Sequence, residues 1–116
     1  MNWVYVFIGG GLGSLLRYSL SLYFTRYTIQ FPISTFISNF CATILVAIFT
    51  FILVKKLDAD WVQPMLIIGF CGGFSTFSTF SLETAYLFQS GNLLLAISNV
   101  LLSLIICVGL VLILNK

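Results

Sequence analysis

Charged residues are scarce in this sequence, and histidine is absent. Only 7% of the 116 residues are Asp, Glu, Lys or Arg, whereas charged side chains form about a quarter of an ordinary globular chain. So few charges cannot cover the surface of a water-soluble domain of this size. The net charge of +2 is also too small to indicate a nucleic-acid partner or a polybasic lipid-binding tail.

The residue combinations that catalysis needs are missing as well. Without histidine, no nucleophile–base pair can be assembled, so we do not expect an enzyme. The three cysteines, Cys41, Cys71 and Cys107, show no metal-ligand spacing and fall inside apolar runs, as inert packing residues do. The first apolar run lacks a basic start and a small-residue cleavage site, so it is not expected to be a removable signal.

Long apolar runs make up the rest of the chain, which is 60% hydrophobic. Each run has the roughly 20 residues that a helix needs to cross about 30 Å of hydrocarbon. We therefore predict an all-α integral membrane protein, with residues 1–116 forming a single four-span domain. The predicted transmembrane helices are residues 3–24, 33–54, 62–88 and 93–114.

The loop charges orient these spans only weakly. Lys55, Lys56 and Lys116 fall on one side, and Arg26 falls on the other, with Arg17 if it belongs to that end of its helix. The positive-inside rule then leaves two interpretations open. Either both termini are cytoplasmic, or the chain inserts in both directions and produces inverted copies that can pair.

The first run contains four glycines and an arginine. Gly9, Gly10, Gly11 and Gly13 are expected to form a surface that another helix backbone can approach closely. Arg17 lies inside the run, where a charge is costly, so it is not expected to face lipid. It is either a fixed structural charge or an electrostatic attractor for anions at an aqueous vestibule.

The second run begins after Pro32 with several polar residues. Thr35, Ser38 and Asn39 share one face of the predicted helix. The amide of Asn39 can donate two hydrogen bonds without carrying a charge. It serves either as a hydrogen-bonding contact between helices or as a neutral donor to a passing anion.

The segment Gly69–Glu83, GFCGGFSTFSTFSLE, is the least lipid-like part of the chain. Each glycine lowers helix stability by about 1 kcal/mol, so the third helix is predicted to break near Gly72-Gly73. The break frees carbonyl oxygens between Phe70 and Ser75, which suit a monovalent cation in a protected interior.

Beyond the predicted break, Phe77 and Phe80 lie on one side of the continuing helix. Polar residues flank them: Ser78 and Ser81 in one stripe, and Thr76, Thr79 and Glu83 in another. The positive edge of an aromatic ring can hold a small, hard anion without trapping it. Glu83 is expected either to pair with Arg17 or to line a water-filled mouth.

The fourth run has three internal polar residues, Ser98, Asn99 and Ser103. Ser98 is predicted to face the same path as Asn39 and the phenylalanines. Asn99 and Ser103 share a helix face at i and i+4, where hydrogen bonding between helices is expected.

Three motifs follow one another along the whole chain: GGGLGSLLRY, the FPxxT…N pattern from Phe31 to Asn39, and GFCGGFSTFSTFSLE. Together they resemble the Fluc (CrcB) family of bacterial fluoride channels. The resemblance implies passive, selective export of fluoride across the cell (inner) membrane, which protects the cytoplasm from fluoride toxicity. It also implies an antiparallel, dual-topology dimer with a second copy or a paralogue, pores that use both subunits, and a structural sodium ion at the dimer centre.

The resemblance assigns roles by position. Phe77 and Phe80 match the phenylalanines whose ring edges meet fluoride, and Asn39 matches a pore-lining asparagine. Gly72 and Ser75 match the positions whose backbone carbonyls hold sodium. The full predicted anion pathway is Asn39, Phe77, Phe80, Ser98, Thr35, Ser78 and Ser81, with Arg17 and Glu83 at the vestibule.

The sequence departs from the family pattern at three positions. Ser75 stands where threonine is usual, which a backbone ligand tolerates. Ser34 and Ala42 stand where glycines are expected in the second span, and they alter helix contacts there without touching the proposed anion path.

Two other functions compete with a fluoride channel. A small multidrug-type proton antiporter also has four spans, but it needs a carboxylate deep in the membrane, typically in the first span. Glu83 is the only candidate here, and it lies in the third run. In a non-transporting assembly or accessory subunit, the polar motifs would serve packing alone.

Overall fold

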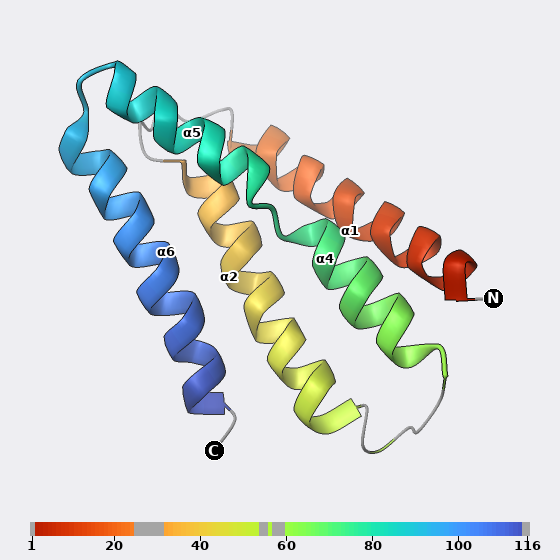
Figure 1. The fold of residues 1–116 in the computed structure, drawn as a ribbon. Helices are drawn as coiled ribbons and strands as arrows, with labels where there is room; N and C mark the ends of the chain where they lie inside the picture. The colour runs from red at the N-terminus through yellow and green to blue at the C-terminus, as the bar shows by residue number, and fades with distance from the viewer. Residues whose placement is uncertain (1, 25–31, 54–55, 57–59, 115–116) are drawn as a thin grey trace.

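The computed structural model describes residues 2–24, 32–53, 56 and 60–114. All regular structure in these residues is helical, as the apolar runs predict (Figure 1). The elements are α1 (Asn2–Phe24), α2 (Ile33–Ile48), η1 (Phe49–Leu53), η2 (Gln63–Cys71), α4 (Gly72–Phe74), α5 (Ser78–Gln89) and α6 (Leu93–Leu114).

Among the residues that the structure describes, three helical segments are long and apolar enough to cross a membrane, namely Ile33–Ile52, Gln63–Gln89 and Leu93–Leu114. They coincide with the second, third and fourth predicted runs, and the chain is a multi-pass membrane protein. α1 forms where the first run predicts a helix and is 23 residues long. Its glycines, serines and Arg17 make it less apolar than the others, so a fourth crossing stays a prediction.

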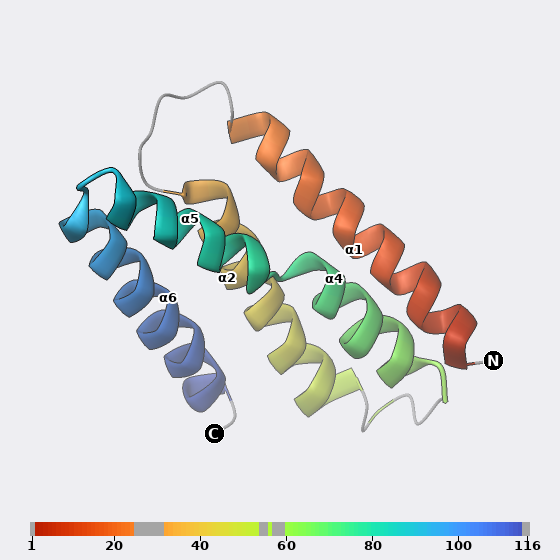
Figure 2. The ribbon, with the colours of Figure 1, turned by 45° about the horizontal axis from the view of Figure 1, so that its top comes forward.

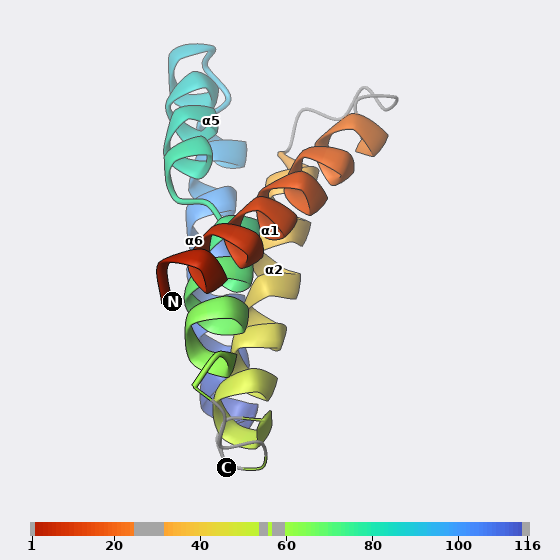
Figure 3. The ribbon, with the colours of Figure 1, turned by 90° about the vertical axis from the view of Figure 1, so that its right-hand side faces the viewer.

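The helices lie in a thin, fan-like arrangement with α2 near its centre. α6 packs along one side of α2, while α1 packs against η2 and α4 on the other side (Figures 1 and 2). Seen from the edge, α1 crosses the remaining helices obliquely (Figure 3). The longest and shortest dimensions are 49 and 20 Å, so most helices have one face without a neighbour among the described residues.

A seam of glycines brings α1 against η2 and α4. It consists of Gly9 and Gly13 from α1 and of Gly69 and Gly73 from the opposite helix. A Cβ atom at Gly73 would lie 2.6 Å from the carbonyl oxygen of Gly10, and one at Gly13 would overlap the carbonyl oxygen of Phe70. Close backbone contact of this kind requires small residues. The predicted glycine surface is confirmed at Gly9 and Gly13, but it is wrong for Gly11, which has nothing within 4 Å of its Cβ position.

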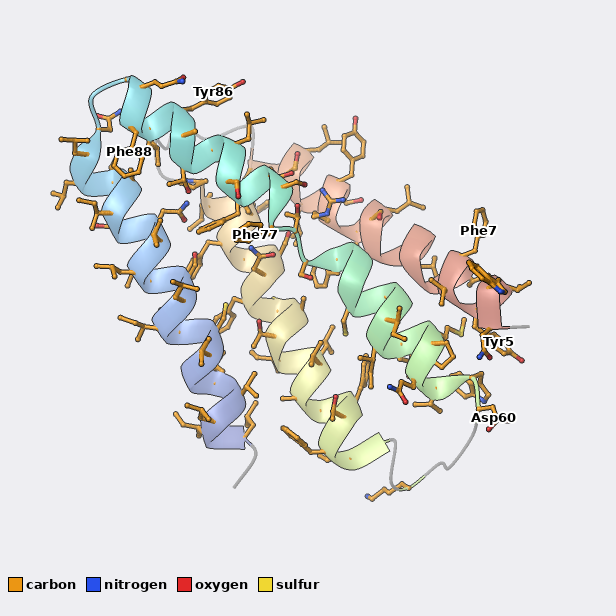
Figure 4. The ribbon with its side chains drawn as sticks, viewed as in Figure 1. Tyr5, Phe7, Asp60, Phe77, Tyr86 and Phe88 are labelled. Atoms are coloured by element: carbon orange, nitrogen blue, oxygen red, sulfur yellow. The ribbon has the colours of Figure 1, made fainter. Side chains whose placement is uncertain are left out.

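The interior consists of small side chains. The most buried apolar residues are Ala42, Ala47, Val62, Cys71, Phe74, Leu87 and Ala96. Large apolar side chains point outward instead, as Figure 4 shows for Phe7, which is 81% exposed. This distribution is typical of helices that pack through small residues and present large ones to lipid or to a partner.

The third apolar run is interrupted between α4 and α5, where residues 75–77 leave the helix. Ser75 is extended, with φ −82° and ψ 158°. Gly72 remains helical, with φ −63° and ψ −37°, so the break follows the predicted Gly72-Gly73 pair rather than coinciding with it. Gly73 is needed as a helical residue in the seam with α1, and the backbone changes course only beyond it.

Two π-helices, η1 and η2, were not predicted. In η2 the N–H of Gly72 donates to Ile67, five residues back, which is the π-helical register. Pro64 lies at the start of η2 and has no backbone N–H to donate. Runs of apolar residues carry no pattern that distinguishes this register from an α-helix.

The short polar break between the third and fourth apolar runs, Gln89–Asn92, is the turn that joins α5 to α6. Gly91 has φ 87°, which favours glycine, and Asn92 N–H donates to the carbonyl of Leu87 at 2.9 Å. Of the polar break between the first two runs, Thr25–Pro32, all but Pro32 lies outside the described residues. So do Arg26, Lys55 and Lys116, on which the orientation argument rests.

Candidate functional site

Asn39 of α2 holds the broken backbone between α4 and α5. Its Oδ1 accepts the N–H of Thr76 at 2.7 Å, and its Nδ2 donates to the carbonyl oxygen of Thr76 at 3.2 Å. In an unbroken helix that N–H would bind the carbonyl of Gly72, so the amide replaces a helical partner. An amide nitrogen carries two hydrogens, and the second has no partner among the described residues.

The side chain of Thr76 completes the start of α5. Thr79 N–H donates to Thr76 Oγ1 at 3.2 Å, and Ser78 Oγ lies 3.3 Å from the same oxygen. A hydroxyl that accepts the N–H three residues ahead acts as a helix N-cap. Thr76 is therefore fixed through its backbone by α2 and through its side chain by α5.

An open groove of about 350 Å³ lies beside the break. Its lining consists of Asn39, Thr43, Gly72, Ser75, Thr76, Phe77, Phe80, Ser103, Leu104 and Cys107. The ring of Phe77 is 76% exposed, and the centroids of Phe77 and Phe80 are 5.8 Å apart. Figure 4 shows Phe77 in the middle of the molecule, beside the break. The structure thus brings the main predicted anion and cation residues to one groove.

The break leaves backbone oxygens free on this groove. Neither the carbonyl of Gly72 nor that of Ser75 accepts a hydrogen bond from any residue that the structure describes. The hydroxyl of Ser75 turns back to the carbonyl of Cys71 at 2.9 Å. Unpaired carbonyls of a discontinuous helix fit a monovalent cation.

Arg17 binds the end of α4. Its Nε donates to the carbonyl oxygen of Gly73 at 3.1 Å, next to the break. A cation that caps free carbonyls at a helix C-terminus is favourably placed, which agrees with a fixed structural charge. Within the described part of the chain, Arg17 forms no ion pair with Glu83.

A second cavity, of about 220 Å³, also has Thr76 in its lining. It is lined by Arg17, Tyr18, Ser21, Ser34, Thr35, Ser38, Thr76, Thr79 and Glu83. The side chain of Thr35 interacts with the Glu83 carboxyl group. Ser38 Oγ and Glu83 Oε1 are buried, and neither has a hydrogen-bond partner in the described residues. Glu83 therefore lines a polar cavity, and its predicted place at a water-filled mouth stays a prediction.

The three polar residues of α6 that were singled out in the sequence lie in different environments. Asn99 is buried and donates to Thr84 Oγ1 at 2.8 Å, which confirms the predicted contact between helices. Ser103 instead lines the larger groove, and its buried Oγ has no partner in the described part of the chain. Ser98 lies outside both cavities. The sequence predicts that Asn99 and Ser103 share a helix face, but it does not predict that Ser103 reaches the groove.

Several other predicted positions do not reach either cavity. Ser78 and Ser81 are exposed on α5, outside the linings of both. Ala42 is buried at 1% exposure, which accords with a helix contact. Ser34, by contrast, was predicted to stay off the anion path, but it lines the smaller cavity. The three cysteines are free thiols, and Cys107 lines the larger groove.

Comparison with known proteins identifies relatives that span most of the chain. The family described as "CrcB-like protein, Camphor Resistance (CrcB)" matches residues 4–114. A protein of Serratia proteamaculans (strain 568) is 42% identical over 101 residues, which are 85% of this chain and 79% of that protein. A protein of Saccharophagus degradans is 38% identical over 109 residues, which are 92% of this chain and 81% of that protein. A protein of Coxiella burnetii (strain CbuK_Q154) is 38% identical over 113 residues, which are 94% of this chain and 90% of that protein. Each is named "Fluoride-specific ion channel FluC". The family match over residues 4–114 and the identity to these relatives show that the chain belongs to the CrcB family.

Proposed function

We propose that this protein is a fluoride-selective ion channel that exports fluoride passively from the cytoplasm and so limits fluoride toxicity. The observation that carries the proposal is the groove in which the Asn39 amide, Phe77 and Phe80 meet beside a helix break. The names of the relatives support fluoride as the ion. Movement of an ion down its gradient needs no covalent step, in keeping with a protein that is not an enzyme.

The chemistry of the groove suits a small, strongly hydrated anion. The free N–H of Asn39 and the unpartnered hydroxyl of Ser103 supply neutral donors. The edges of Phe77 and Phe80 supply weak positive potential. Such ligands replace hydration water without the tight binding of a buried lysine, and conduction requires that balance.

The groove of one chain is open, and this supports assembly with a second copy. The exposure of Phe77 leaves the anion path without an opposite wall among the described residues. An antiparallel, dual-topology dimer of four-span subunits in the bacterial cell membrane would supply that wall, and a paralogue of opposite orientation could replace the second copy. Ser78, Ser81 and Ser98 belong to the path only if the partner completes it.

The smaller cavity is proposed as the vestibule of the pathway. Arg17 contributes positive potential there while it remains bound to Gly73. Thr35 and Glu83 provide polar groups for hydrated ions. Thr76 borders both cavities and so connects the vestibule to the groove.

The two competing functions have less support. Antiport by a protonatable carboxylate would rest on Glu83, which lies off the larger groove. A purely structural subunit gives no reason for an exposed Phe77 ring and a buried, unpartnered Ser103 hydroxyl at one groove. The named relatives also favour a channel.

Fluoride efflux from liposomes, followed with a fluoride electrode and a valinomycin shunt, tests this function. The wild-type protein is expected to release fluoride much faster than protein-free vesicles. Phe77→Ile removes an aromatic edge, and an increase of about 1.4 kcal/mol in the barrier corresponds to a roughly tenfold slower efflux. Phe7→Ile is the matched control, because Phe7 is 81% exposed on α1, away from the groove. Wild-type vesicles no faster than empty ones would contradict the channel.

A sodium ion at the break is proposed to stabilise the dimer through the carbonyls of Gly72 and Ser75. Exchange of sodium for N-methylglucamine is expected to lower the melting temperature and the efflux rate. A ligand present at about 100 times its Kd stabilises the bound state by about 2.7 kcal/mol. Ser75→Ala is a sharp companion variant, because it removes the Oγ but keeps the proposed backbone ligand. Indifference of the wild type to sodium, or loss of the sodium effect in Ser75→Ala, would speak against backbone carbonyls as the ligands.

A further inference from the structure

A chain of two hydrogen bonds connects α6 to the backbone that carries Phe80. Asn99 is 1% exposed, and its Nδ2 donates to Thr84 Oγ1 at 2.8 Å. Thr84 Oγ1 in turn donates to the carbonyl oxygen of Phe80 at 2.8 Å. Both distances lie within the usual range for their donor types. The backbone of Phe80 is therefore linked to a buried side chain on a different helix.

The direction of these bonds is internally consistent. A hydroxyl has one hydrogen to donate and two lone pairs to accept with. Thr84 uses its hydrogen for Phe80 and a lone pair for Asn99, so both bonds exist at once. In a buried, low-dielectric setting such bonds polarise and strengthen one another. Asn99 thus acts on Phe80 through Thr84 and does not touch the ring.

The position of α5 gives this link its importance. α5 follows the break and has no continuous helix before it to fix its rotation. Asn39 holds Thr76 at the entrance of α5, and Asn99 holds Thr84 one turn beyond Phe80. The rings of Phe77 and Phe80 lie between these two attachments, 5.8 Å apart. With one attachment alone, α5 could rotate and move both rings relative to the groove.

We propose that Asn99 is a positioning residue for anion conduction: through Thr84 it fixes the rotation of α5 and therefore the orientation of the Phe77–Phe80 pair. This rests on the proposed fluoride channel. The role goes beyond a contact between helices, because it predicts a change at the rings when the contact is lost.

The first test compares side chains at Thr84 and Asn99 by fluoride efflux. Asn99→Leu and Thr84→Val are expected to slow efflux about tenfold, the effect of about 1.4 kcal/mol on the barrier. Thr84→Ser keeps the hydroxyl and should remain within about twofold of the wild type. Ser19→Ala is the matched control, because it removes a similar 2.8 Å hydroxyl–carbonyl bond from the exposed face of α1. Equal efflux in Thr84→Val and Thr84→Ser would overturn the proposal.

The second test observes the ring itself. 4-Fluorophenylalanine at position 80 is expected to give one ¹⁹F line in the wild type and a shifted or broadened line in Asn99→Leu and Thr84→Val. The same label at position 7 should not respond. Slower efflux with an unchanged line at position 80 would overturn the positioning role. If the wild type carries no fluoride, the proposed function fails, and the ¹⁹F comparison still decides whether Asn99 orients the ring. If Asn99→Leu does not fold, Thr84→Val and Thr84→Ser decide.

Discussion

Fluoride efflux is expected to fall by two to three orders of magnitude when Asn39 is replaced by aspartate. A unit negative charge about 4 Å from a passing anion adds about 4 kcal/mol at an effective dielectric constant near 20, and about 1.4 kcal/mol corresponds to each tenfold in rate. The carboxylate also has no N–H for the carbonyl of Thr76, which Asn39 Nδ2 now reaches at 3.2 Å. The substitution therefore opposes the anion and weakens the break at the same time.

Asn92→Asp is the control for the added charge. Asn92 lies in the turn before α6, where its Nδ2 contacts Ser90 Oγ at 3.2 Å and is exposed. The Asn92→Asp variant should therefore release fluoride at a rate near that of the wild type. Gel filtration of each variant in detergent separates lost conduction from lost folding. Wild-type efflux in a well-folded Asn39→Asp protein would remove Asn39 from the anion path.

Replacement of Gly13 by valine is expected to prevent accumulation of folded protein. The new Cβ would overlap the carbonyl oxygen of Phe70 and lie 2.8 Å from the backbone nitrogen of Phe74. These are backbone atoms, which cannot move aside as the end of a flexible side chain can. Overpacking of a well-packed site costs about 1–3 kcal/mol of folding free energy and occasionally more. Because the clashing atoms at Gly13 belong to the backbone, we expect a cost at the upper end of that range.

Gly11→Val makes the same chemical change two residues from Gly13, off the seam. Nothing lies within 4 Å of the Cβ position of Gly11, so this variant should yield folded protein like the wild type. Yield after gel filtration and resistance to unfolding in SDS measure the difference. Similar yields for the two variants would show that α1 does not pack closely through Gly13.

The helices themselves could be predicted because run length and hydropathy determine them. The fourth predicted span, residues 93–114, coincides with α6, and the third differs by one residue at each end from Gln63–Gln89. The position of the helix break was predicted less closely, since residues 75–77 leave the helix just after the Gly72-Gly73 pair. Glycine favours both a helix break and a close helix contact, and the sequence does not reveal that Gly73 serves the second purpose.

The candidate site was predicted best where side chains identify themselves. Asn39, Phe77 and Phe80 line one groove. They could be predicted because an amide and two aromatic side chains stand out among the polar and glycine-rich parts of apolar runs. Ser103 was assigned to packing, since the choice between it and Ser98 depends on how far α6 is rotated. The hydrogen-bond partner of Arg17 could not be predicted either, because it is a backbone carbonyl oxygen and every residue has one.

The small-residue interior determines which kinds of substitution this protein tolerates. Its largest fully buried side chains are Val62, Asn99, Cys71 and Ser38, so little volume can be lost by truncation except at Phe74 and Leu87, which are nearly buried. Alanine scanning would therefore detect few damaging apolar positions, whereas a scan with leucine would detect many. Mutational robustness here is asymmetric: the chain withstands removal of bulk and is vulnerable to its addition.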